Sequence, residues 1–543
     1  MSGAPSRHGL LLSGAFVALL AVPVLVAVLA PGDAISQSEK RRLADFPPLP
    51  RSVAMANAFP GGFNAWFNDH FGLRVPLGQL HALIRVKLLA TSPKNGVAVG
   101  RDGWLYYGGA PMQAYRGAIP VPPQALSNLQ YFLESKRDWL AERGIRYLFT
   151  IAPDKQTVYP EHVPLEPVGP TPADFLVAHL AAHSDLEVLD QRTVLQAARP
   201  GPDPLYMKTD SHWNALGAFV AYRAIMERVR QWFPLTPLEQ DQIGLQRKPS
   251  HGGNLADQIN LAPFLRDEEI TVERNSGPCN QRTPVPVESP QPYPVRQAPF
   301  ATHCEEATPL RVLVLRDSFA NDLAPFLSRQ FADVTYIWQG SVGHPLWETP
   351  GLMRQILARQ QVDLVIEQLP ERKLMMPVGP DPEFMAATAR RQFSLAAPAP
   401  PVPLRAYPVQ QAAVSPADDG LVLRPTGAAP VVALPLGPDR PGRWPVVRLT
   451  LTSPAATRLV VLYQTTEDQT FSAKRRLMVP VDAGANAVYF EIPSAQATDS
   501  VLLGLGQGEG TFRLHQVEIR AGRQDPAVPT PTRRLVASAA GQG

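Results

Sequence analysis

Hydrophobic and polar positions alternate between a helical and an extended pattern over residues 123–369. Residues 123–143 have apolar side chains at helical spacing, begin at a proline and end before Gly144, which predicts a helix. The next segment, 145–153, is a short apolar run, as expected of a strand that is buried on both faces. The repeated alternation predicts an α/β fold with a largely parallel sheet. Further helices are predicted at 173–183, 214–232, after 319 and at 351–360, and further strands at 186–189, 311–315, 333–338 and 363–369.

The pattern changes near residue 409 to short alternating segments, which Pro, Gly, Asp and Ser separate. This change predicts an all-β module at 409–525 with the architecture of a sandwich or jelly roll. Such modules are a common frame for sugar-binding domains, and Trp444, Tyr463 and Tyr489 are candidate sugar-stacking rings. The alternative is that at least two of these three rings are core aromatics.

The N-terminal segment at 9–32 is uncharged and mostly apolar. A stretch of about 20 such residues is long enough to cross the hydrocarbon core of a bilayer. Arg7 and His8 precede the segment and no acid does, which predicts a short cytoplasmic tail and an exported body. We therefore expect a transmembrane helix that anchors a periplasmic protein to the inner membrane. A cleaved signal peptide is the alternative, and it also exports the body.

The chain is long enough for two or three domains, since it has 543 residues of which 45% are hydrophobic. Prolines concentrate in loops and in the segments 282–299 and 396–408, which are typical of irregular or linker structure. The expected organisation is an anchor or signal at 1–33, an α/β domain at 34–395, a Pro-rich linker at 396–408, the β module at 409–525 and a disordered tail at 526–543.

Charge and cysteine content exclude some classes of function. The 51 Lys and Arg against 48 Asp and Glu leave a net charge of +3, and no basic run interleaves with aromatics, which argues against nucleic acid as a partner. Cys279 and Cys304 are the two cysteines. In an oxidising compartment they can form a disulfide that contributes roughly 3 kcal/mol, and two unpaired thiols are the alternative. Neither has a second Cys or a His at ligand spacing, so no metal site is expected.

Two polar clusters carry candidate chemistry. In the first, Asp210 and His212 precede an apolar helical run, and their spacing places both side chains on one side of an extended segment. In the second, the strand at 311–315 ends at Asp317 and Ser318, where a strand-to-helix turn exposes a serine at the edge of the sheet. A serine nucleophile needs a base, and a histidine base needs a carboxylate to orient it. Because loops that follow parallel strands share one edge, the two clusters are expected to meet.

The alternative for these clusters is helix capping. Asp210 or Ser211 would cap the helix at 214–232, His212 would be an ordinary polar residue, and Ser318 would cap the helix after 319.

Seven motifs between residues 34 and 377 resemble the alginate O-acetyltransferase family typified by AlgJ and AlgX. In chain order they are ISQSEKRRLADFPPLP, FNDHFGLRVPL, VGRDGWLYY, APDKQTVYPEHVP, KTDSHWNALGA, RDSF and DLVIEQLPER. The resemblance implies an SGNH-hydrolase-like catalytic domain in which Ser318 takes the acetyl group, His212 is the general base and Asp210 orients it. This sequence has Arg316 where the family has Gly, and Ser211 where it has Thr. Arg316 either disturbs a tight turn or adds a cation that binds an acidic sugar.

The resemblance also implies an activity. We expect an O-acetyltransferase that modifies an exported or cell-surface polysaccharide through an acetyl-serine intermediate, without a cofactor. A membrane partner of the membrane-bound O-acyltransferase type would supply the acetyl groups. The alternatives are a polysaccharide acetylesterase with the same triad and a non-catalytic polysaccharide-binding scaffold. Lys155, Tyr159 and Arg372 are weaker candidates for lining the cleft and stay outside the predicted catalytic set, and no Asn is identified as an oxyanion donor.

Overall fold

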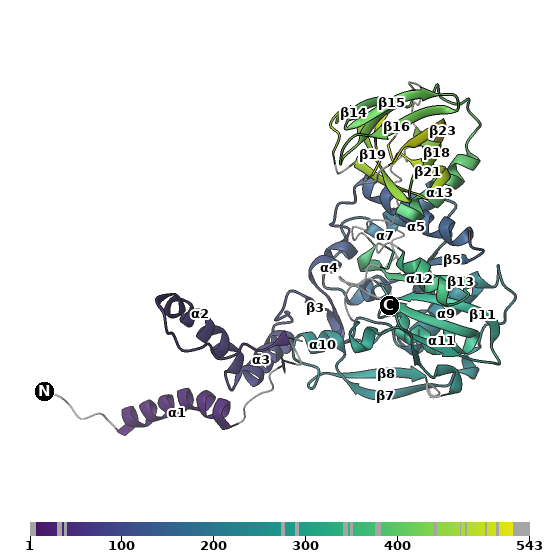
Figure 1. Cartoon of the computed structure of the whole chain (residues 1–543). Coiled ribbons are helices and arrows are strands. Elements are labelled where there is room, and N and C mark those ends of the chain that lie inside the picture. The colour runs from purple at the N-terminus through teal and green to yellow at the C-terminus, as the bar shows by residue number, and fades with distance from the viewer. Residues whose placement is uncertain are drawn as a thin grey trace.

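The computed structural model describes residues 7–29, 35–36, 41–272, 277–287, 293–339, 346–347, 351–374, 382–437, 443–466, 468–472, 475–494, 497–506 and 510–524. It contains an α/β body, an all-β part at one end of this body, and N-terminal helices that project from its side (Figure 1). The predicted disordered tail at 526–543 lies outside the described residues.

A seven-stranded sheet forms the centre of the body. In spatial order its strands are β6 (Val188–Asp190), β5 (Arg146–Ala152), β13 (Leu364–Pro370), β11 (Thr308–Arg316), β12 (Phe331–Trp338), β10 (Phe300–His303) and β9 (Thr283–Pro284). The first five run parallel, and β10 and β9 are antiparallel at one edge. The predicted α/β fold with a largely parallel sheet is confirmed, whereas the sequence pattern does not predict the antiparallel edge.

Helices cover both faces of this sheet. Alternate residues of a strand point to opposite faces, so a central strand contributes to two hydrophobic cores. Within β11, Val312 and Val314 belong to one hydrophobic core, and Leu313 and Leu315 belong to the other. The first core also receives residues from α8 (Gln191–Ala198), α9 (Ala215–Val229) and α11 (Ala320–Gln330), and the second from α5 (Pro123–Ala141), α7 (Pro172–His183) and α12 (Leu352–Arg359). Burial on both faces explains why these strands are continuous apolar runs.

The sequence pattern does not predict several short elements. They are β1 (Ile35–Ser36), β2 (Arg41–Arg42), β3 (Val97–Val99), β4 (Leu105–Tyr107), α4 (Gly109–Arg116), α6 (Lys155–Val158), β7 (Leu245–His251), α10 (Asn254–Gln258), β8 (Arg266–Val272), and the 3-10 turns η2 (Arg101–Gly103), η3 (Pro160–His162), η4 (Gln240–Gln242), η5 (Pro278–Asn280), η6 (Val295–Gln297) and η7 (Glu371–Lys373). Cys279 in η5 and Cys304 after β10 form a disulfide, so the paired alternative is the correct one.

The C-terminal part consists of two five-stranded antiparallel sheets, which confirms the all-β prediction. One sheet contains β14 (Tyr407–Gln410), β17 (Val431–Pro435), β22 (Ala497–Gly504), β19 (Thr457–Thr465) and β20 (Arg476–Val481), and the other contains β15 (Ala412–Ala417), β16 (Gly420–Pro425), β23 (Phe512–Gln524), β18 (Arg443–Ser453) and β21 (Gly484–Glu491). A single hydrophobic core draws residues from both sheets, as in a sandwich.

Two of the three rings suggested for sugar stacking are buried inside the protein. Trp444 is buried and lies edge-on to Tyr131 of α5, and Tyr463 is part of the sandwich core. Tyr489 packs edge-on against Phe393. The sugar-stacking prediction is therefore wrong for Trp444 and Tyr463, and the alternative that at least two of the rings are core aromatics is correct, whereas Tyr489 is half-buried.

Helix α13 (Pro382–Leu395) lies between the sandwich and α5 (Figure 1). A buried ion-pair cluster accompanies it: Arg523 of β23 pairs with Glu134 of α5 and, at 3.1 Å, with Glu491 of β21. The segment predicted as a linker, 396–408, follows the sandwich over part of its length, because the N–H of Val402 donates to the carbonyl of Val517 at 3.0 Å. The sandwich is thus joined to the body by packed and charged contacts.

The N-terminal helices are α1 (Arg7–Leu29), α2 (Val53–His70) and α3 (Arg74–Leu83), followed by the π-helical turn η1 (Ile84–Leu88). They extend away from the sheet (Figure 1). In the part of the chain that the structure describes, no helix has both the length and the apolar character needed to span a bilayer. The transmembrane part of the prediction for residues 1–33 is therefore not supported.

Candidate active site

The structure brings the three predicted side chains together in series. Ser318 follows the end of β11, and Asp210 and His212 lie in the loop between α8 and α9. His212 Nε2 is 2.8 Å from Ser318 Oγ, and His212 Nδ1 is 2.7 Å from Asp210 Oδ1. The His212 side chain is 21% exposed, so the series can be reached from solvent.

Both oxygens of the Asp210 carboxylate accept hydrogen bonds. Oδ1 also accepts the N–H of His212 at 2.9 Å, and Oδ2 accepts the N–H of Asn254 at 2.7 Å. Burial raises the pKa of Asp210, but the hydrogen bonds from His212 and Asn254 outweigh it and lower the pKa to about 2. The carboxylate is therefore ionised at neutral pH and fixes the orientation of the imidazole.

The capping alternative is wrong for the first cluster. Helix α9 has Asn214 as its N-cap, and the Asn214 side chain accepts the N–H groups of Leu216 and Gly217 at 3.0 and 3.1 Å. The Ser211 hydroxyl instead accepts a hydrogen bond from the Asn254 side chain at 2.8 Å. Asp210 and Ser211 are thus free of any capping role at α9.

Trp213 connects the two clusters. Its buried indole donates from Nε1 to the carbonyl of Phe319 at 3.1 Å. The Phe319 ring lies 4.9 Å from the rings of both His212 and Trp213. This packing fixes the turn that presents Ser318 to His212.

Asp317 shapes the same turn. Its Oδ1 accepts the N–H of Phe319 at 3.0 Å and that of Ala320 at 3.3 Å, and thereby caps the start of α11. Ser318 does not provide this cap, and its hydroxyl contacts His212.

Both expectations for Arg316 are wrong. Arg316 pairs with Trp338 in the regular register of β11 and β12, so the backbone does not need a glycine there. Its guanidinium donates to Asn321 Oδ1 at 2.8 Å and to the carbonyl of Ala298 at 3.1 Å. The residue is 1% exposed, so its guanidinium points into the protein and an acidic sugar cannot reach it.

The Lys155 side chain packs against the loop that carries Asp210. Its ammonium group donates to the carbonyls of Met207 at 3.0 Å, Lys208 at 2.8 Å and Asp210 at 2.5 Å. The residue is 1% exposed, and burial lowers its pKa to about 7 against the opposing charges of Asp210 and Asp267. Lys155 therefore supports the site without touching Ser318 or His212.

The other two weak candidates have structural contacts. The Tyr159 hydroxyl accepts the N–H of Leu205 at 2.8 Å. Arg372 forms an ion pair with Asp154, and its guanidinium lies 5.2 Å from the centre of the Phe319 ring. Arg372 thus borders the turn of Ser318 but is already paired.

Sequence reasoning missed Gly253, Asn254 and Asp267. Asp267 accepts the N–H and the hydroxyl of Thr209 at 2.7 and 2.6 Å, which holds the loop on its other side. A Cβ atom at Gly253 would lie 2.6 Å from Oδ2 of Asp210, so only glycine allows Asn254 to reach the carboxylate. The Gly-Gly-Asn sequence at 252–254 is the signal that could have indicated this close approach.

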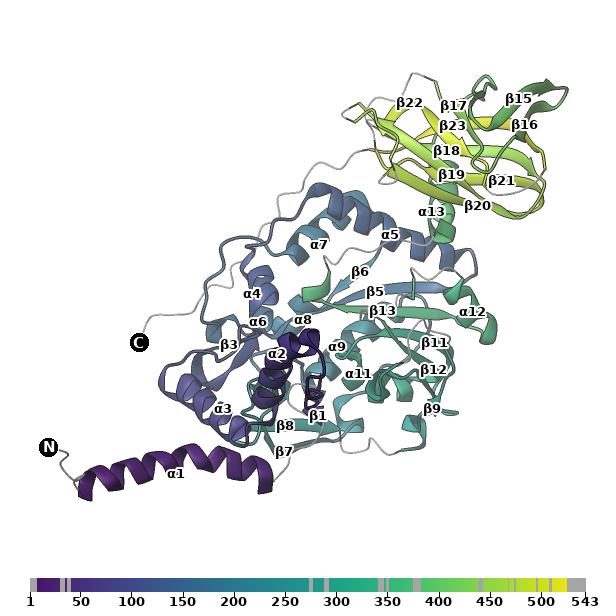
Figure 2. The same ribbon diagram turned by 60° about the vertical axis from the view of Figure 1, so that its left-hand side comes forward.

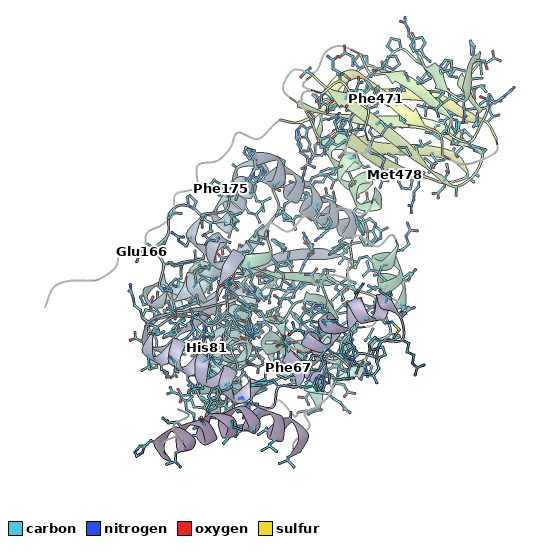
Figure 3. All side chains as sticks on the ribbon, turned by 90° about the vertical axis from the view of Figure 1, so that its left-hand side faces the viewer. Phe67, His81, Glu166, Phe175, Phe471 and Met478 are labelled. Carbon is cyan, nitrogen blue, oxygen red and sulfur yellow. A yellow bond between two sulfur atoms is a disulfide. The ribbon has the colours of Figure 1, made fainter. Side chains whose placement is uncertain are left out.

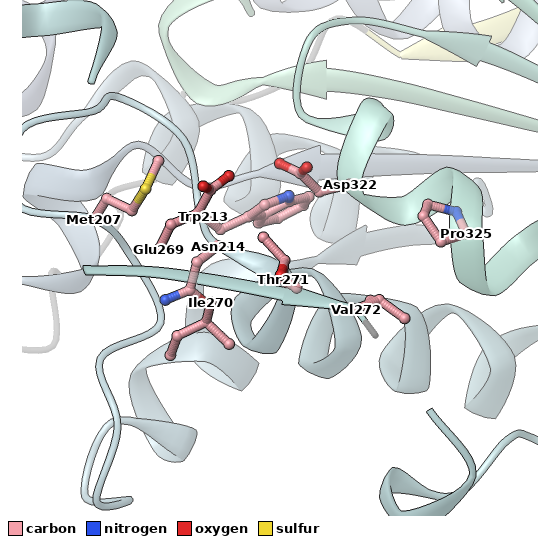
Figure 4. A pocket seen from close by; sticks show the side chains of 10 residues that line it. Met207, Trp213, Asn214, Glu269, Ile270, Thr271, Val272, Asp322 and Pro325 are labelled. Carbon is pink, nitrogen blue, oxygen red and sulfur yellow. The ribbon is translucent and has the colours of Figure 1, made fainter. Parts of the chain in front are cut away.

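A cavity of about 150 Å³ borders the site beyond Trp213. Figure 4 shows the Glu269 and Asp322 carboxylates on either side of the Trp213 indole. Burial and, to a smaller extent, the charge of Asp210 raise the pKa of Asp322 to about 7, although His212 lowers it. Among the residues that the structure describes, no group of His, Cys, Asp and Glu side chains is arranged to hold a metal ion.

The mixed α/β sheet, with Ser, His and Asp in series near the ends of its strands, has the architecture of the SGNH-hydrolase-like class. A family model described as "SGNH hydrolase-like domain, acetyltransferase AlgX" matches residues 97–371, about half of the chain, and the chain belongs to this family.

Curated relatives agree with this assignment. The probable alginate O-acetylase AlgJ of Pseudomonas aeruginosa is 26% identical over 210 residues, which are 37% of this chain and 51% of the relative. The protein of the same name from Pseudomonas fluorescens is 25% identical over 220 residues, which are 39% of this chain and 55% of the relative. This chain therefore spans about half the length of the curated relatives it matches.

Solved structures with similarity include the O-acetyltransferase domain of Pseudomonas putida AlgJ. It is 19% identical, with a TM-score of 0.33, and the match covers 53% of this chain and 94% of that one. Pseudomonas aeruginosa AlgX is 14% identical, with a TM-score of 0.28, and the match covers 78% of this chain and 94% of that one.

Proposed function

We propose that this protein is an O-acetyltransferase that transfers an acetyl group to a hydroxyl of an exported polysaccharide through an acetyl-Ser318 intermediate. The observation that carries the proposal is the position of His212, which contacts Ser318 on one side and Asp210 on the other. Membership of the AlgX family supports it, as does the description of the curated relatives as probable alginate O-acetylases.

In the first half-reaction, Ser318 Oγ attacks the acetyl carbonyl while His212 Nε2 takes the hydroxyl proton. The tetrahedral intermediate collapses, and the leaving group of the donor departs with that proton. The N–H of Ser318, two residues before α11, stabilises the oxyanion. The ionised Asp210 stabilises the imidazolium that forms in between.

In the second half-reaction, a sugar hydroxyl gives its proton to His212 as its oxygen attacks the acetyl-serine. The proton then passes to Ser318 Oγ, which leaves as the free hydroxyl. Transfer predominates over hydrolysis when a bound sugar hydroxyl takes the place of water beside His212.

The proposal includes the location of the protein and the source of the acetyl groups. The body works on the periplasmic side of the inner membrane, where acetyl-CoA is not available. A membrane-bound partner of the O-acyltransferase type therefore supplies the acetyl groups.

The test is intact-protein mass spectrometry after incubation with p-nitrophenyl acetate as a surrogate donor. We expect wild type to gain one acetyl group or to turn the donor over, and Ser318→Ala and His212→Ala to do neither. Ser415→Ala, at an exposed position on β15, is the matched control and should behave as wild type. A natively folded wild type with no Ser318-dependent reaction would refute the proposal and favour the binding scaffold.

The acceptor is tested in a second step, in which alginate oligosaccharides are added to the acetylated protein. Acetylated oligosaccharide in the products supports transfer. Release of acetate from an acetylated glycan, with no transfer to any hydroxyl, would instead identify an esterase.

A further inference from the structure

The N-terminal arm, which we define as residues 46–89, carries a cluster of aromatic rings outside the hydrophobic cores. Phe46 lies edge-on to Trp66 with ring centres 4.9 Å apart, and the stacked rings of Phe63 and Phe67 are 6.1 Å apart. Phe46, Phe63 and Phe67 are exposed, and α2 has no buried residue. In Figure 3, Phe67 and His81 lie on the side of the molecule from which the arm projects.

A second apolar stripe follows on α3 and η1. Leu77, Leu80, Ile84 and Leu88 recur at helical spacing and are between 42% and 77% exposed. The opposite side of the same helix is occupied, because Ala82 belongs to a small core of the body. This helix therefore docks on the body with one apolar side and leaves another apolar side open.

Exposed apolar side chains concentrate in the arm. Among the described residues that follow α1, eleven of the eighteen large hydrophobic side chains that are exposed lie within residues 46–89. Single exposed hydrophobic residues are normal, but a continuous patch of this kind marks an interaction surface.

The same region is basic although the chain as a whole is nearly neutral. Residues 46–89 contain four Lys and Arg against one Asp or Glu, a net charge of +3 that equals the net charge of the whole chain. The remaining residues together are therefore neutral. A surface that combines basic and exposed apolar side chains matches an anionic bilayer, where apolar groups enter the headgroup region and cations contact lipid phosphates.

Helix α1 extends this surface. A Cβ atom at Gly72, between α2 and α3, would lie 2.4 Å from the carbonyl oxygen of Pro23 and 2.5 Å from the N of Ala27. The backbone of α1 thus packs directly on the arm, and α1 itself presents exposed Leu, Val and Phe side chains. In Figures 1 and 2, α1 lies next to α3.

We propose that the N-terminal arm lies on the surface of an anionic lipid bilayer, with its aromatic cluster and the Leu77–Leu88 stripe in the boundary between headgroups and acyl chains. The arm contributes its own affinity, in addition to whatever α1 contributes. It also orients the body, so that the same side of the body always faces the bilayer.

The test is flotation of the full chain with vesicles of phosphatidylcholine, with and without phosphatidylglycerol. We expect binding to the anionic vesicles that falls as salt is added. The variant Leu77→Ser/Leu80→Ser/Leu88→Ser should lose affinity on the order of tenfold, because it removes buried apolar area at the boundary. These side chains are exposed, so the variant should keep the near-UV circular dichroism and thermal midpoint of wild type.

Two matched controls separate the arm from general surface effects. The variant Phe264→Ser/Leu395→Ser changes exposed apolar residues elsewhere and should bind as wild type. The charge reversal Lys87→Glu should weaken binding to anionic vesicles, and the reversal Arg424→Glu on the sandwich should not.

A measurement on otherwise unchanged protein keeps the proposal testable if the stripe variant does not fold. Brominated lipids should quench a fluorescence component of wild type that is missing in Trp66→Phe. The proposal is overturned if Trp66 is not quenched, or if the stripe variant binds as tightly as wild type, which would assign binding to α1 alone. It is also overturned if the stripe variant converts a dimer into a monomer without lipid, which would identify a second copy as the occupant.

Discussion

Replacement of Lys155 by Met tests how the Asp210 loop is held in place. The wild-type ammonium group donates to three carbonyls, at 2.5 to 3.0 Å, in the four residues that end at Asp210. Methionine has a similar length and fills the same space, but it donates no hydrogen bond. The loop then keeps its contacts with Asn254 and Asp267 and the backbone hydrogen bonds to Lys208 and Thr209, but the carbonyls of Met207 and Asp210 lose their donor.

The expected loss of stability follows from these three contacts. A buried acceptor that loses its donor costs about 1 kcal/mol or more, and the Lys208 carbonyl still accepts the N–H of Leu105. We therefore expect Lys155→Met to lower the free energy of unfolding by about 2 kcal/mol near pH 6. The effect on the reaction should be separate: a displacement of about 1 Å in a catalytic group can reduce the rate on the order of 100-fold. We therefore expect acetylation of Ser318 to slow on the order of 10- to 100-fold in protein that remains folded.

The difference in stability should also depend on pH in a defined direction. Burial lowers the pKa of Lys155 from 10.5 to about 7 in the folded protein. Between these values the unfolded chain holds the proton and the folded protein does not, so the stability of wild type rises with pH. Lys155→Met lacks this contribution, and the gap between the two proteins should widen by about 1.4 kcal/mol per pH unit above pH 7.

The assay combines urea unfolding at pH 6 and pH 9 with the rate of acetyl-enzyme formation below the unfolding transition. Lys136→Met is the matched control, because Lys136 is equally buried but pairs with Glu367 at 2.6 Å. It should lose stability, since it leaves a buried charge unpaired, yet keep the wild-type acetylation rate. Equal acetylation rates in wild type and Lys155→Met, or a gap in stability that does not change with pH, would refute this reasoning.

Three further outcomes are expected. Gly253→Ala places a Cβ atom 2.6 Å from the Asp210 carboxylate and should slow acetyl-enzyme formation in a chain with native circular dichroism; a wild-type rate would contradict the close approach. Trp213→Phe replaces the buried indole with a smaller ring and removes the N–H donor, and should lower the free energy of unfolding by about 1 kcal/mol for the lost hydrogen bond and by more for the space that is left, as measured in urea titration. Replacement of Cys279 and Cys304 by Ser opens a loop whose ends are 25 positions apart, and should lower the free energy of unfolding by roughly 3 kcal/mol. Reduction of the wild-type disulfide should have the same effect.

Strands that are buried on both faces could be predicted because burial itself leaves a continuous apolar run. Strand 145–153 is observed at Arg146–Ala152, and helix 123–143 at Pro123–Ala141. Hairpin β7–β8 could not be predicted, because much of it is exposed and β7 reads LQRKPSH, with no apolar alternation. Helix α2 contains Pro60 and two glycines, which oppose helix formation locally, and the contacts of its aromatic rings offset them.

The candidate active site also contains residues that the sequence predicts and residues that it does not. Asp210, His212 and Ser318 could be predicted because their residue types and local patterns carry the chemistry. The Gly-Gly-Asn sequence at 252–254 signals a close backbone approach but not its partner, because Asn254 reaches Asp210 across 44 positions. Arg316 misled the prediction because a sequence does not show whether a cation faces a ligand or backbone carbonyls.

The long separations within the site have a consequence for when it forms. The contact between His212 and Ser318 joins positions 106 residues apart, and the contacts of Lys155 with the Asp210 loop join positions 52 to 55 apart. Contacts of such high sequence separation form late, after the loop between them has been closed. A partly folded or partly synthesised chain therefore has no activated serine, and reactivity toward acetyl donors begins only when β11 has joined the sheet.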